Sequence, residues 1–544
     1  MRNIFLFVLL FFVLSLNKGF GDIIFVTTSS DSGAGSFRQA MFEADRAEGA
    51  DTIQFNIPTS DPGYNADIGI WTIQPDTLFD KLIGDSTFID GASQTVNQGD
   101  TNPEGPEIEI DGTNVEESGF IIEGPYNKIS GLIINRFAYY GIMIGNTEAT
   151  GNIIAGNYIG TDATGEIALG NVLGGIQIWG DAEGNVIGGL TPSERNIISG
   201  STHHGNIYHG NGITLKGAYY TKILGNYIGT NKDGTASLPN IDYGISLTFG
   251  ENNVIGGLEE GAANVISGNS GGGIFIRFSE TTNNTILGNF IGTDPTGTHN
   301  LGNWREGIYL DWGTINNVIG PQNVIRYNGN YGIIVKHDST TGIKITQNSI
   351  SDHGPGISLQ EGGNDSLASP IILEVTDSNV SGTACADCMV EIFSDSLDEG
   401  RIYEGTTTAD GSGNFMWTGN TTGPNVTAVA IDTAGNTSQF SSAFVTSVEE
   451  SEHVQIPGKY GLFQNYPNPF NPTTAIGYRL SAVSDVELRI YNVLGQKVAT
   501  IVSTRQEAGI HQIEWDATEF ASGVYYYKIQ AGEFVDVRKM VLIR

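Results

Sequence analysis

The sequence contains little that would build a disulfide-framed or a helical protein. Two of its 544 residues are cysteines, so disulfide bonds cannot frame a fold of this size. Stretches of ten or more residues with a 3.6-residue apolar period, which helical repeats require, are missing. After the first residues no apolar run is long enough to cross a membrane as a helix. The fold must therefore be built from strands.

Positive charge is also scarce. Lys and Arg number 26 against 60 Asp and Glu, which gives a formal net charge of −34. Such a chain would repel phosphate backbones, so we expect no nucleic-acid partner. Charged residues make up 16% of the chain and glycine contributes 74 residues. This composition indicates tight turns and an extracellular surface, or a surface that gathers divalent cations.

One short pattern recurs along the middle of the chain. It consists of Gly, Ile, any residue and an aliphatic residue, and its copies are about 24 to 37 residues apart, as in solenoid repeats. The eight copies lie at 141–144, 175–178, 212–215, 244–247, 273–276, 307–310, 332–335 and 356–359. Within each tetrad the two aliphatic side chains face one way and the third residue faces the other. Strands this short bury an apolar face only when coils stack, which predicts a parallel β-solenoid.

Asparagines and insertions mark the same coils. Runs of the type Asn-x-Ile-x-Gly-Asn predict one stacked asparagine per coil, with Ser201 as the exception: Asn157, Asn226, Asn269, Asn289, Asn328 and Asn348. Stacked asparagines can bond amide to amide, although asparagine is also a common turn residue. Insertions alternate between odd coils and even coils: 158–165, 227–234 and 290–297, against 185–190, 253–258 and 317–320. The structural period is therefore a pair of coils.

These features resemble the secreted bacterial right-handed parallel β-helix proteins of the pectin-lyase-like class. The resemblance covers most of residues 22–365 and implies the fold but not the activity, since one scaffold hosts many functions. At the start, a strand at 23–28 precedes a helix that Ser36 caps and that extends to about Ala47. Its apolar stripe is Phe37, Ala40, Met41 and Ala44. We expect residues 22–60 to cap the open edge of the first coil.

The whole chain is expected to contain five consecutive parts. Residues 1–21 have the pattern of a signal peptide, with a basic start, an apolar core and small residues before the cut. The parts that follow are the β-helix (22–365), an immunoglobulin-like β-sandwich (366–447), a linker (448–457) and a sorting domain (458–544). Within the sandwich, Cys385 and Cys388 are expected to form a local disulfide, because a metal site would need two more ligands nearby.

The last part carries the most specific pattern in the chain. Five of its segments resemble the type A C-terminal sorting domain of the type IX secretion system: 462–480, 490–501, 509–518, 522–530 and 537–544. The resemblance implies recognition by the type IX machinery at the outer membrane, removal of the domain, and release or attachment at the cell surface. We therefore expect an exported protein without a transmembrane segment after signal removal.

The tetrad register predicts two outward columns of side chains, because coils stack about 4.8 Å apart. The third tetrad position gives Met143, Gln177, Thr214, Ser246, Phe275, Tyr309, Ile334 and Ser358. The position after the tetrad gives Gly145, Trp179, Lys216, Thr248, Arg277, Asp311, Lys336 and Gln360. Five of these residues are predicted to share one face that suits a sugar, especially an acidic one: Phe275, Arg277, Tyr309, Asp311 and Lys336.

Two classes of function remain open. In one, this face binds a glycan or has a structural or adhesive role, and Arg277, Asp311 and Lys336 neutralise one another as a cross-strand ladder. In the other, the chain is a polysaccharide lyase or a glycoside hydrolase acting on an acidic polysaccharide. A lyase would use Lys336 or Lys216 as base and Arg277 to neutralise a uronate carboxylate. A hydrolase would use Asp311 with Asp338 as its pair of carboxyl groups.

Other polar residues offer further sites. Four histidines are alternative bases: His203, His204, His337 and His353. Asp162, Asp233 and Asp294 recur in the insertions of the odd coils, and acidic turns can bind Ca²⁺. The same Thr-Asp-x-Thr-Gly sequence is also ordinary turn chemistry. No other cofactor is expected.

Overall fold

The computed structural model describes most of the chain in two units, Met1–Ser447 and Val448–Arg544, which we treat separately. The described residues are 21–46, 49–202, 210–397, 399–445, 460–462, 465, 468, 470–506, 509–532 and 534–543. The predicted signal peptide (1–21) lies outside these residues except for its last position, and the predicted linker (448–457) lies wholly outside them. Among the described residues, no helix is long and apolar enough to cross a membrane.

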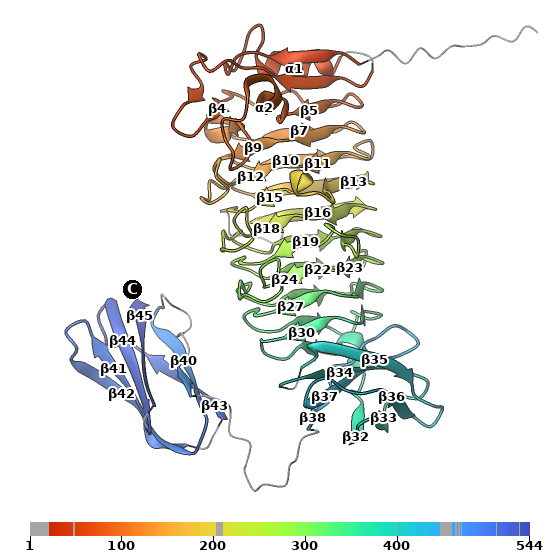
Figure 1. Cartoon of the computed structure of the whole chain (residues 1–544), viewed down its shortest axis with the longest axis vertical. Coiled ribbons are helices and arrows are strands. Elements are labelled where there is room, and N and C mark those ends of the chain that lie inside the picture. The colour runs from red at the N-terminus through yellow and green to blue at the C-terminus, as the bar shows by residue number, and fades with distance from the viewer. Residues whose placement is uncertain are drawn as a thin grey trace, which may run out of the picture. The chain divides into compact units, whose positions relative to one another are not determined.

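Three sheets run along the first unit, and each regular coil adds one strand to each sheet (Figure 1). One sheet has eleven strands: β1 (Ile23–Val26), β2 (Thr52–Phe55), β5 (Phe88–Asp90), β8 (Lys128–Ser130), β11 (Ile153–Ala155), β14 (Val186–Gly188), β17 (Lys222–Leu224), β20 (Val254–Gly256), β23 (Thr285–Leu287), β26 (Val318–Ile319) and β29 (Lys344–Ile345). The predicted parallel β-helix is confirmed.

The second and third sheets complete the coils. The second contains the tetrads: β7 (Phe120–Ile122), β10 (Tyr140–Gly145), β13 (Gly174–Glu183), β16 (Asn211–Tyr219), β19 (Ile245–Thr248), β22 (Ile274–Arg277), β25 (Ile308–Asp311), β28 (Ile333–Lys336) and β31 (Ile357–Gln360). The third contains β3 (Tyr64–Asn65), β4 (Ile70–Ile73), β6 (Ile108–Asp111), β9 (Leu132–Asn135), β12 (Tyr158–Ile159), β15 (Ile197–Ile198), β18 (Tyr227–Ile228), β21 (Val265–Ile266), β24 (Phe290–Ile291), β27 (Val324–Arg326) and β30 (Ser349–Ser351).

The tetrad aliphatics form the interior of the solenoid. Ile176 pairs with Ile213 and Ile178 with Leu215 in the next coil, and all four side chains are almost completely buried. Burying each such side chain contributes about 1.5–3 kcal/mol. A strand of four residues is therefore stable because its apolar pair is continued by identical pairs above and below.

Asparagine side chains form hydrogen-bonded ladders at three turns of the coil. The ladder before the third sheet contains Asn157, Asn196, Asn226, Asn264, Asn289, Asn323 and Asn348, each bonded to the next. A ladder after that sheet contains Ser201, Asn240, Asn269, Asn303 and Asn328. A further series precedes the first sheet in two pieces: Asn127, Asn152 and Asn185, and then Asn253, Asn284 and Asn317. Thr221 stands between them; its backbone N–H donates to Asn253, but its hydroxyl has no hydrogen-bond partner among the described residues.

The predicted amide-to-amide stacking is confirmed, but the predicted set needs correction. Asn269 and Asn328, together with Ser201, do not lie in the same ladder as the other four predicted asparagines. The Gly-Asn pattern falls before the third-sheet strand in odd coils and after it in even coils. Sequence spacing alone therefore merged two different turns into one series.

The structure repeats every two coils, because odd and even coils carry their extra loop residues at different places. In odd coils the insertion follows the third-sheet strand and folds back over an outward aromatic ring, as Gly165 does over Tyr158 and Gly234 over Tyr227. A Cβ at either glycine would lie within about 3.0 Å of the ring, so the fold-back needs glycine. The predicted even-coil insertions need correction, because each contains a strand of the first sheet: β14, β20 and β26.

The N-terminal cap has the predicted design. Helix α1 (Phe37–Ala44) begins at Ser36, whose side chain accepts a hydrogen bond from the Gln39 N–H at 3.2 Å. The whole predicted stripe of α1 is buried: Phe37, Ala40, Met41 and Ala44. The helix ends at Ala44, three residues before the predicted end. The other helices are α2 (Ser93–Gln98) and the short η1 (Gly112–Asn114), η2 (Pro192–Glu194) and η3 (Gly363–Ser366).

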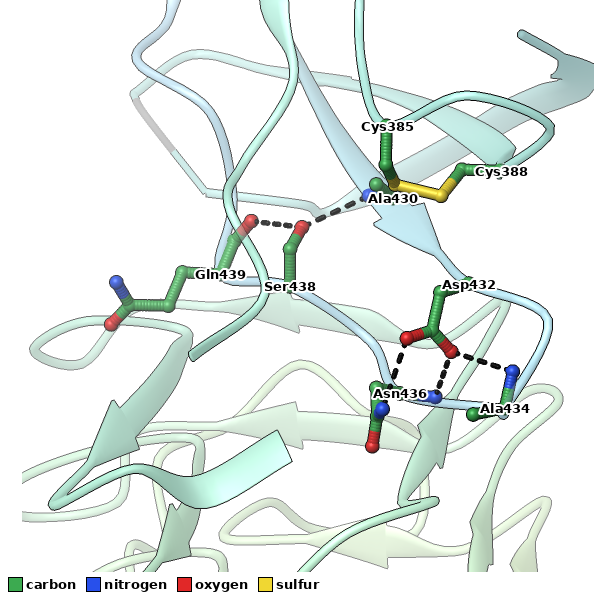
Figure 2. The surroundings of a disulfide bond; sticks show 8 residues. All are labelled: Cys385, Cys388, Ala430, Asp432, Ala434, Asn436, Ser438 and Gln439. Carbon is green, nitrogen blue, oxygen red and sulfur yellow. Dashed lines mark hydrogen bonds between the residues drawn. A yellow bond between two sulfur atoms is a disulfide. The ribbon is translucent and has the colours of Figure 1, made fainter. Parts of the chain in front are cut away.

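Two antiparallel sheets follow the last coil. One contains β32 (Ile371–Val375), β33 (Asn379–Thr383) and β36 (Asn414–Thr418), and the other contains β35 (Ile402–Thr408), β34 (Met389–Asp395), β37 (Asn425–Ile431) and β38 (Phe444–Val445). A disulfide joins Cys385 to Cys388 where the chain enters β34, as Figure 2 shows. Beyond β37, the Asp432 carboxylate accepts hydrogen bonds from two backbone N–H groups and fixes the turn (Figure 2).

This sandwich closes the open end of the solenoid. The Ile345 N–H donates to Thr437 Oγ1 at 2.8 Å, so a sandwich residue takes the position of a further coil. The Glu391 carboxylate accepts hydrogen bonds from the Thr346 hydroxyl and the Gln347 N–H. Burial raises the pKa of Glu391, although these hydrogen bonds oppose the rise. The unpaired edge of the last coil is thereby covered.

The second unit is a separate antiparallel sandwich. One sheet contains β39 (Gly461–Leu462), β40 (Thr473–Leu480) and β43 (Gly509–Asp516). The other contains β42 (Lys497–Gln506), β41 (Ser484–Asn492), β44 (Gly523–Ala531) and β45 (Phe534–Leu542). Buried side chains such as Leu488, Tyr527 and Trp515 form its core.

Candidate ligand-binding face

The second sheet presents the two predicted columns in the predicted register. Ser246, Phe275 and Tyr309 lie opposite one another in successive coils, and Thr248, Arg277 and Asp311 do the same. Lys336 ends the strand of the following coil. The predicted face is therefore assembled from residues that are about 30 positions apart in the sequence.

Aromatic rings stack along the first column. Phe275 lies 5.2 Å from Tyr309 and 4.7 Å from Tyr243, measured between ring centres, with nearly parallel planes. Tyr243 comes from the loop before β19, and its hydroxyl donates to a Glu306 carboxylate oxygen at 2.5 Å. Stacked rings of this kind contribute about 0.5–1.5 kcal/mol per pair beyond the area that they bury.

A second aromatic stack occupies the turn that follows each tetrad strand. Every residue at this position has a positive φ, between 50° and 77°: Asn146, Gly180, Gly217, Phe249, Phe278, Trp312, His337 and Glu361. Phe249 and Phe278 stack in parallel at 4.6 Å, and Trp312 meets Phe278 edge-on at 5.5 Å. Left-handed backbone is unfavourable for bulky side chains. Three successive aromatic residues, Phe249, Phe278 and Trp312, nevertheless have this left-handed backbone.

Arg277 lies between the two stacks. Its guanidinium carbon is 4.3 Å from the ring centre of Trp312, 4.5 Å from Phe275 and 5.0 Å from Phe278. Cation–π contacts with three rings hold a planar, permanently charged group in one orientation. Trp312 remains 52% exposed, so one aromatic surface of this cluster faces solvent. We call Phe275, Arg277, Tyr309, Trp312 and Lys336 the aromatic face.

Asp311 is engaged by its neighbours. The Tyr309 hydroxyl donates to one carboxylate oxygen at 3.0 Å, and the Trp312 N–H donates to the other at 2.6 Å. The Nδ1 atom of His337 also contacts the second oxygen. Burial raises the pKa of Tyr309, and the charge of Asp311 raises it further.

The predicted ladder of Arg277, Asp311 and Lys336 needs correction. Lys336 Nζ pairs with Glu361 at 3.2 Å, and His337 lies between Asp311 and Glu361, with its Nε2 2.9 Å from Glu361. Lys336 and Asp311 are therefore each paired with a residue of the turn rather than with each other. Asp338, the second carboxylate of the predicted hydrolase pair, is exposed, whereas the Asp311 side chain is 4% exposed.

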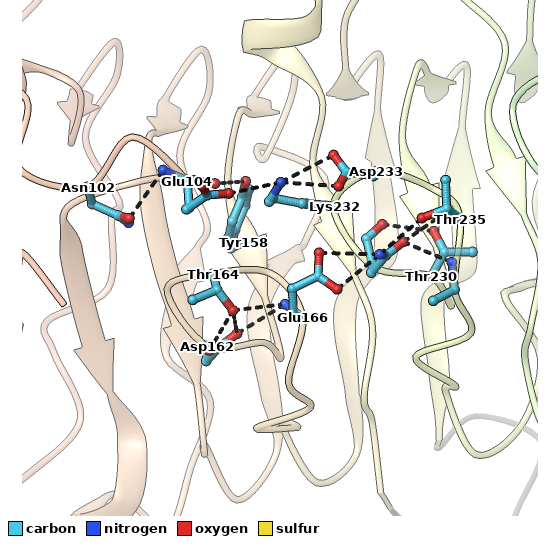
Figure 3. Close-up of polar contacts among 12 residues, drawn as sticks. Asn102, Glu104, Tyr158, Asp162, Thr164, Glu166, Thr230, Lys232, Asp233 and Thr235 are labelled. Carbon is cyan, nitrogen blue, oxygen red and sulfur yellow. Dashed lines mark hydrogen bonds and ion pairs between the residues drawn. The ribbon is translucent and has the colours of Figure 1, made fainter.

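The odd-coil insertions form a different polar cluster, shown in Figure 3. The Asp162 carboxylate accepts hydrogen bonds from the Thr164 hydroxyl and from two backbone N–H groups of its own loop. Asn231 and Asp294 have the same role in the next two odd coils. Asp233 lies two positions later and pairs with Lys232 instead (Figure 3).

The predicted recurrence of Asp162, Asp233 and Asp294 is therefore wrong in its middle member, which is Asn231. Burial tends to raise the pKa of Asp294, but hydrogen bonds from His299, Thr296 and Thr298 outweigh it and hold that pKa well below its usual range. These carboxylates stabilise their own turns. The described residues contain no group of three or more His, Cys, Asp or Glu that could hold a metal ion.

Of the remaining candidate bases, those that the structure describes do not belong to the aromatic face. His203 and His204 are outside the described residues. The His353 side chain is completely buried, with its Nδ1 3.1 Å from a Glu399 oxygen at the junction with the sandwich. Lys216 is exposed on the same column, two coils before Arg277. The sequence analysis did not predict the turn stack. Its signal was present, because an aromatic residue directly follows the column position in three successive coils: Phe249, Phe278 and Trp312.

Comparisons with known proteins match the last part of the chain. Residues 464–543 match the family model described as the secretion system C-terminal sorting domain, about one seventh of the chain. No curated protein matches.

Similar solved structures include the BSP domain of a biofilm-associated protein, with 13% identity, a TM-score of 0.13, and coverage of 33% of this chain and 30% of that chain. Dimeric latent PorU from Porphyromonas gingivalis is matched at 15% identity with a TM-score of 0.14, covering 32% of this chain and 20% of that chain. PorZ, a surface component of the type-IX secretion system of the same organism, is matched at 13% identity with a TM-score of 0.13, covering 32% and 22%. TM-scores this low carry no argument.

Proposed function

We propose that this exported β-helix binds an acidic polysaccharide on its aromatic face. Residues 464–543 form a type IX secretion system C-terminal sorting domain, which accounts for the export. The sorting domain directs the chain to the cell surface or the medium. There the solenoid serves as a glycan-binding or adhesive surface.

The placement of Arg277 carries the proposal. Flat rings pack against the apolar faces of sugars, and a guanidinium recognises a carboxylate with two parallel hydrogen bonds. Three rings surround this guanidinium within 5.0 Å, and one of them, Trp312, is about half exposed. The exposed ring of Trp312 and the guanidinium of Arg277, a residue that is only 7% exposed, are therefore held together.

The charge distribution supports an acidic ligand. The chain has a formal net charge of −34, so an acidic polymer would be repelled by most of its surface. On the second sheet, however, the column after the tetrads carries three cations, Lys216, Arg277 and Lys336, against one carboxylate, Asp311, although Lys336 is itself paired with Glu361. Local cations on an acidic body favour binding in one place and one orientation.

Retention on immobilised glycans tests the proposal. The purified chain is applied to a panel of uronate-containing, sulfated and neutral polysaccharides, and the change in tryptophan fluorescence is recorded. Trp312→Ala should reduce retention on the acidic members by about tenfold, which corresponds to losing one well-placed contact. Tyr126→Ala is the matched control, since Tyr126 is 63% exposed before β8 and far along the solenoid from Trp312. Equal retention of both variants would exclude the aromatic face as the site.

A second function, polysaccharide lyase or glycoside hydrolase, is favoured by one observation. His337 is held by Asp311 at one ring nitrogen and by Glu361 at the other, beside Lys336. A lyase needs a base next to a uronate carboxylate that a cation neutralises, and Lys336 with Arg277 provides these groups, whereas both ring nitrogens of His337 already contact carboxylates.

Turnover separates the two functions. The same panel is monitored for the ultraviolet absorbance of unsaturated uronate and for new reducing ends. Absorbance that Lys336→Ala or His337→Ala abolishes would establish the lyase. Reducing ends without absorbance would indicate a hydrolase, and retention without either product supports the binding function.

A further inference from the structure

The larger sheet of the second unit has one face that its own core does not use. Side chains of β41 and β44 alternate, so that Leu488, Ile490, Tyr527 and Ile529 are buried in the core. The intervening residues face outward in cross-strand rows. One row is Lys497, Tyr491, Tyr526 and Lys539, and the next is Thr500, Arg489, Lys528 and Val537.

These rows surround a shallow groove of about 350 Å³. Its lining includes Tyr491, Val493, Tyr526, Lys528 and Val537. Several of its apolar side chains are unusually open to solvent, with 65% exposure for Val493 and 48% for Val537. A contiguous apolar surface with a polar rim is typical of an interaction site.

The rim of this groove is basic. Arg489 lies directly opposite Lys528, an arrangement that costs stability because like charges face each other. Two ion pairs of the described part of this unit, Arg489 with Glu487 and Arg538 with Asp536, do not involve Lys528. Glu487 offsets the charge of Arg489, so Lys528 is the cation that borders the apolar groove.

The charge of this part of the chain differs from that of the rest. Residues 458–544 contain 9 Lys and Arg against 8 Asp and Glu, whereas residues 22–447 contain 15 against 49. The acidic character that dominates the β-helix is therefore absent where the sorting domain begins. A basic groove on this domain is complementary to an acidic protein surface.

We infer that this groove is the surface by which the sorting domain docks on a protein of the secretion system, and that the partner presents an apolar ridge flanked by carboxylates. The family match indicates that the partner belongs to the export machinery, and the basic rim indicates that the partner's surface is acidic. Tyr491 and Tyr526 are the central anchors, since buried aromatic residues dominate interface energies. Lys528 and Lys539 set the orientation and the association rate.

Export of the full chain tests the inference. In a bacterium that carries the secretion system, the chain is measured at the cell surface and in the medium, and compared with the amount retained in the periplasm. Lys528→Glu with Lys539→Glu, and separately Tyr526→Ser with Val537→Ser, should lower the exported fraction about tenfold. The control is Arg505→Glu, a charge reversal on the same sheet about 20 Å along the strand from Tyr491.

Folding and partner identity are measured alongside. Thermal unfolding of each retained chain shows whether it is folded, and Lys528→Gln with Lys539→Gln removes the charge with the least disturbance. A photo-crosslinking residue at Tyr526 should join the chain to a protein of the secretion system. Normal export of folded groove variants would overturn the inference, as would crosslinks to lipopolysaccharide or to the chain's own β-helix.

Discussion

The guanidinium of Arg277 lies 4.3 Å from the ring centre of Trp312, a residue of the next coil whose φ is 55°. Left-handed backbone costs a bulky residue roughly 1–2 kcal/mol. Glycine avoids this cost at the same turn in two earlier coils, at Gly180 and Gly217. Trp312 accepts a backbone conformation that glycine would adopt at lower cost, and in return its ring contacts Arg277. This supports a functional role for the aromatic face.

Replacing Trp312 by glycine separates function from stability. Trp312→Gly removes the ring and also relieves the backbone strain, so the free energy of unfolding should change by less than about 1 kcal/mol. Retention on acidic polysaccharide should nevertheless fall about tenfold. Denaturant titration and the retention assay measure the two effects. A variant that still binds as tightly as the unchanged chain would show that the ring is structural.

The asparagine ladder should be indispensable to the solenoid. Asn264 accepts two hydrogen bonds from Asn226 and donates to Ile223 O and to Asn289. Asn264→Ala leaves several buried groups without partners, at a cost of about 1–3 kcal/mol each. We expect a loss of about 3 kcal/mol or more, measured by denaturant unfolding. The exposed Asn420 provides the control, and equal losses for both alanine variants would contradict a stabilising ladder.

Asp294 should make its insertion sensitive to acid. Its pKa is depressed in the folded chain from the ordinary value of 3.8, so it contributes stability above about pH 4 that is lost as pH falls toward the folded pKa. Asp294→Asn should remove this dependence, because Asn231 accepts the same backbone hydrogen bonds in the preceding odd coil. Limited proteolysis of the 294–299 loop between pH 5 and pH 2 measures it. Identical acid profiles for the two chains would refute the assignment.

The buried pair of His353 and Glu399 should hold the sandwich to the last coil. The His353 Nδ1 atom hydrogen-bonds the Gly354 carbonyl at 3.0 Å and lies 3.1 Å from a Glu399 oxygen, whereas the Glu399 oxygens have no hydrogen-bond partner among the described residues, so the buried carboxylate relies on the charge of this imidazole. His353→Leu alone leaves a buried carboxylate unpaired and should cost about 3–5 kcal/mol. His353→Leu with Glu399→Leu should recover most of this loss. Thermal unfolding compares the variants, and a double variant as unstable as the single one would count against the pairing.

Much of the fold was predictable because its signals are local. The alternation of side chains within Gly-Ile-x-Ile follows from the two-residue period of a strand, so Ile274 and Ile276 had to face inward and Phe275 outward. The stripe of α1 and its Ser36 cap follow from spacing over a single helix in the same way. The segments of the sorting domain were specific enough to be identified without any structure.

The sequence by itself determined that each coil contains one tetrad strand, and that Arg277 and Asp311 lie in an outward column. Tertiary structure alone decided that Asp311 is joined to His337, and that Asn269 and Asn289 belong to different ladders. The physical reason is that these contacts join residues more than twenty positions apart. Their geometry depends on the length and turn conformation of each insertion between them, which no local period encodes.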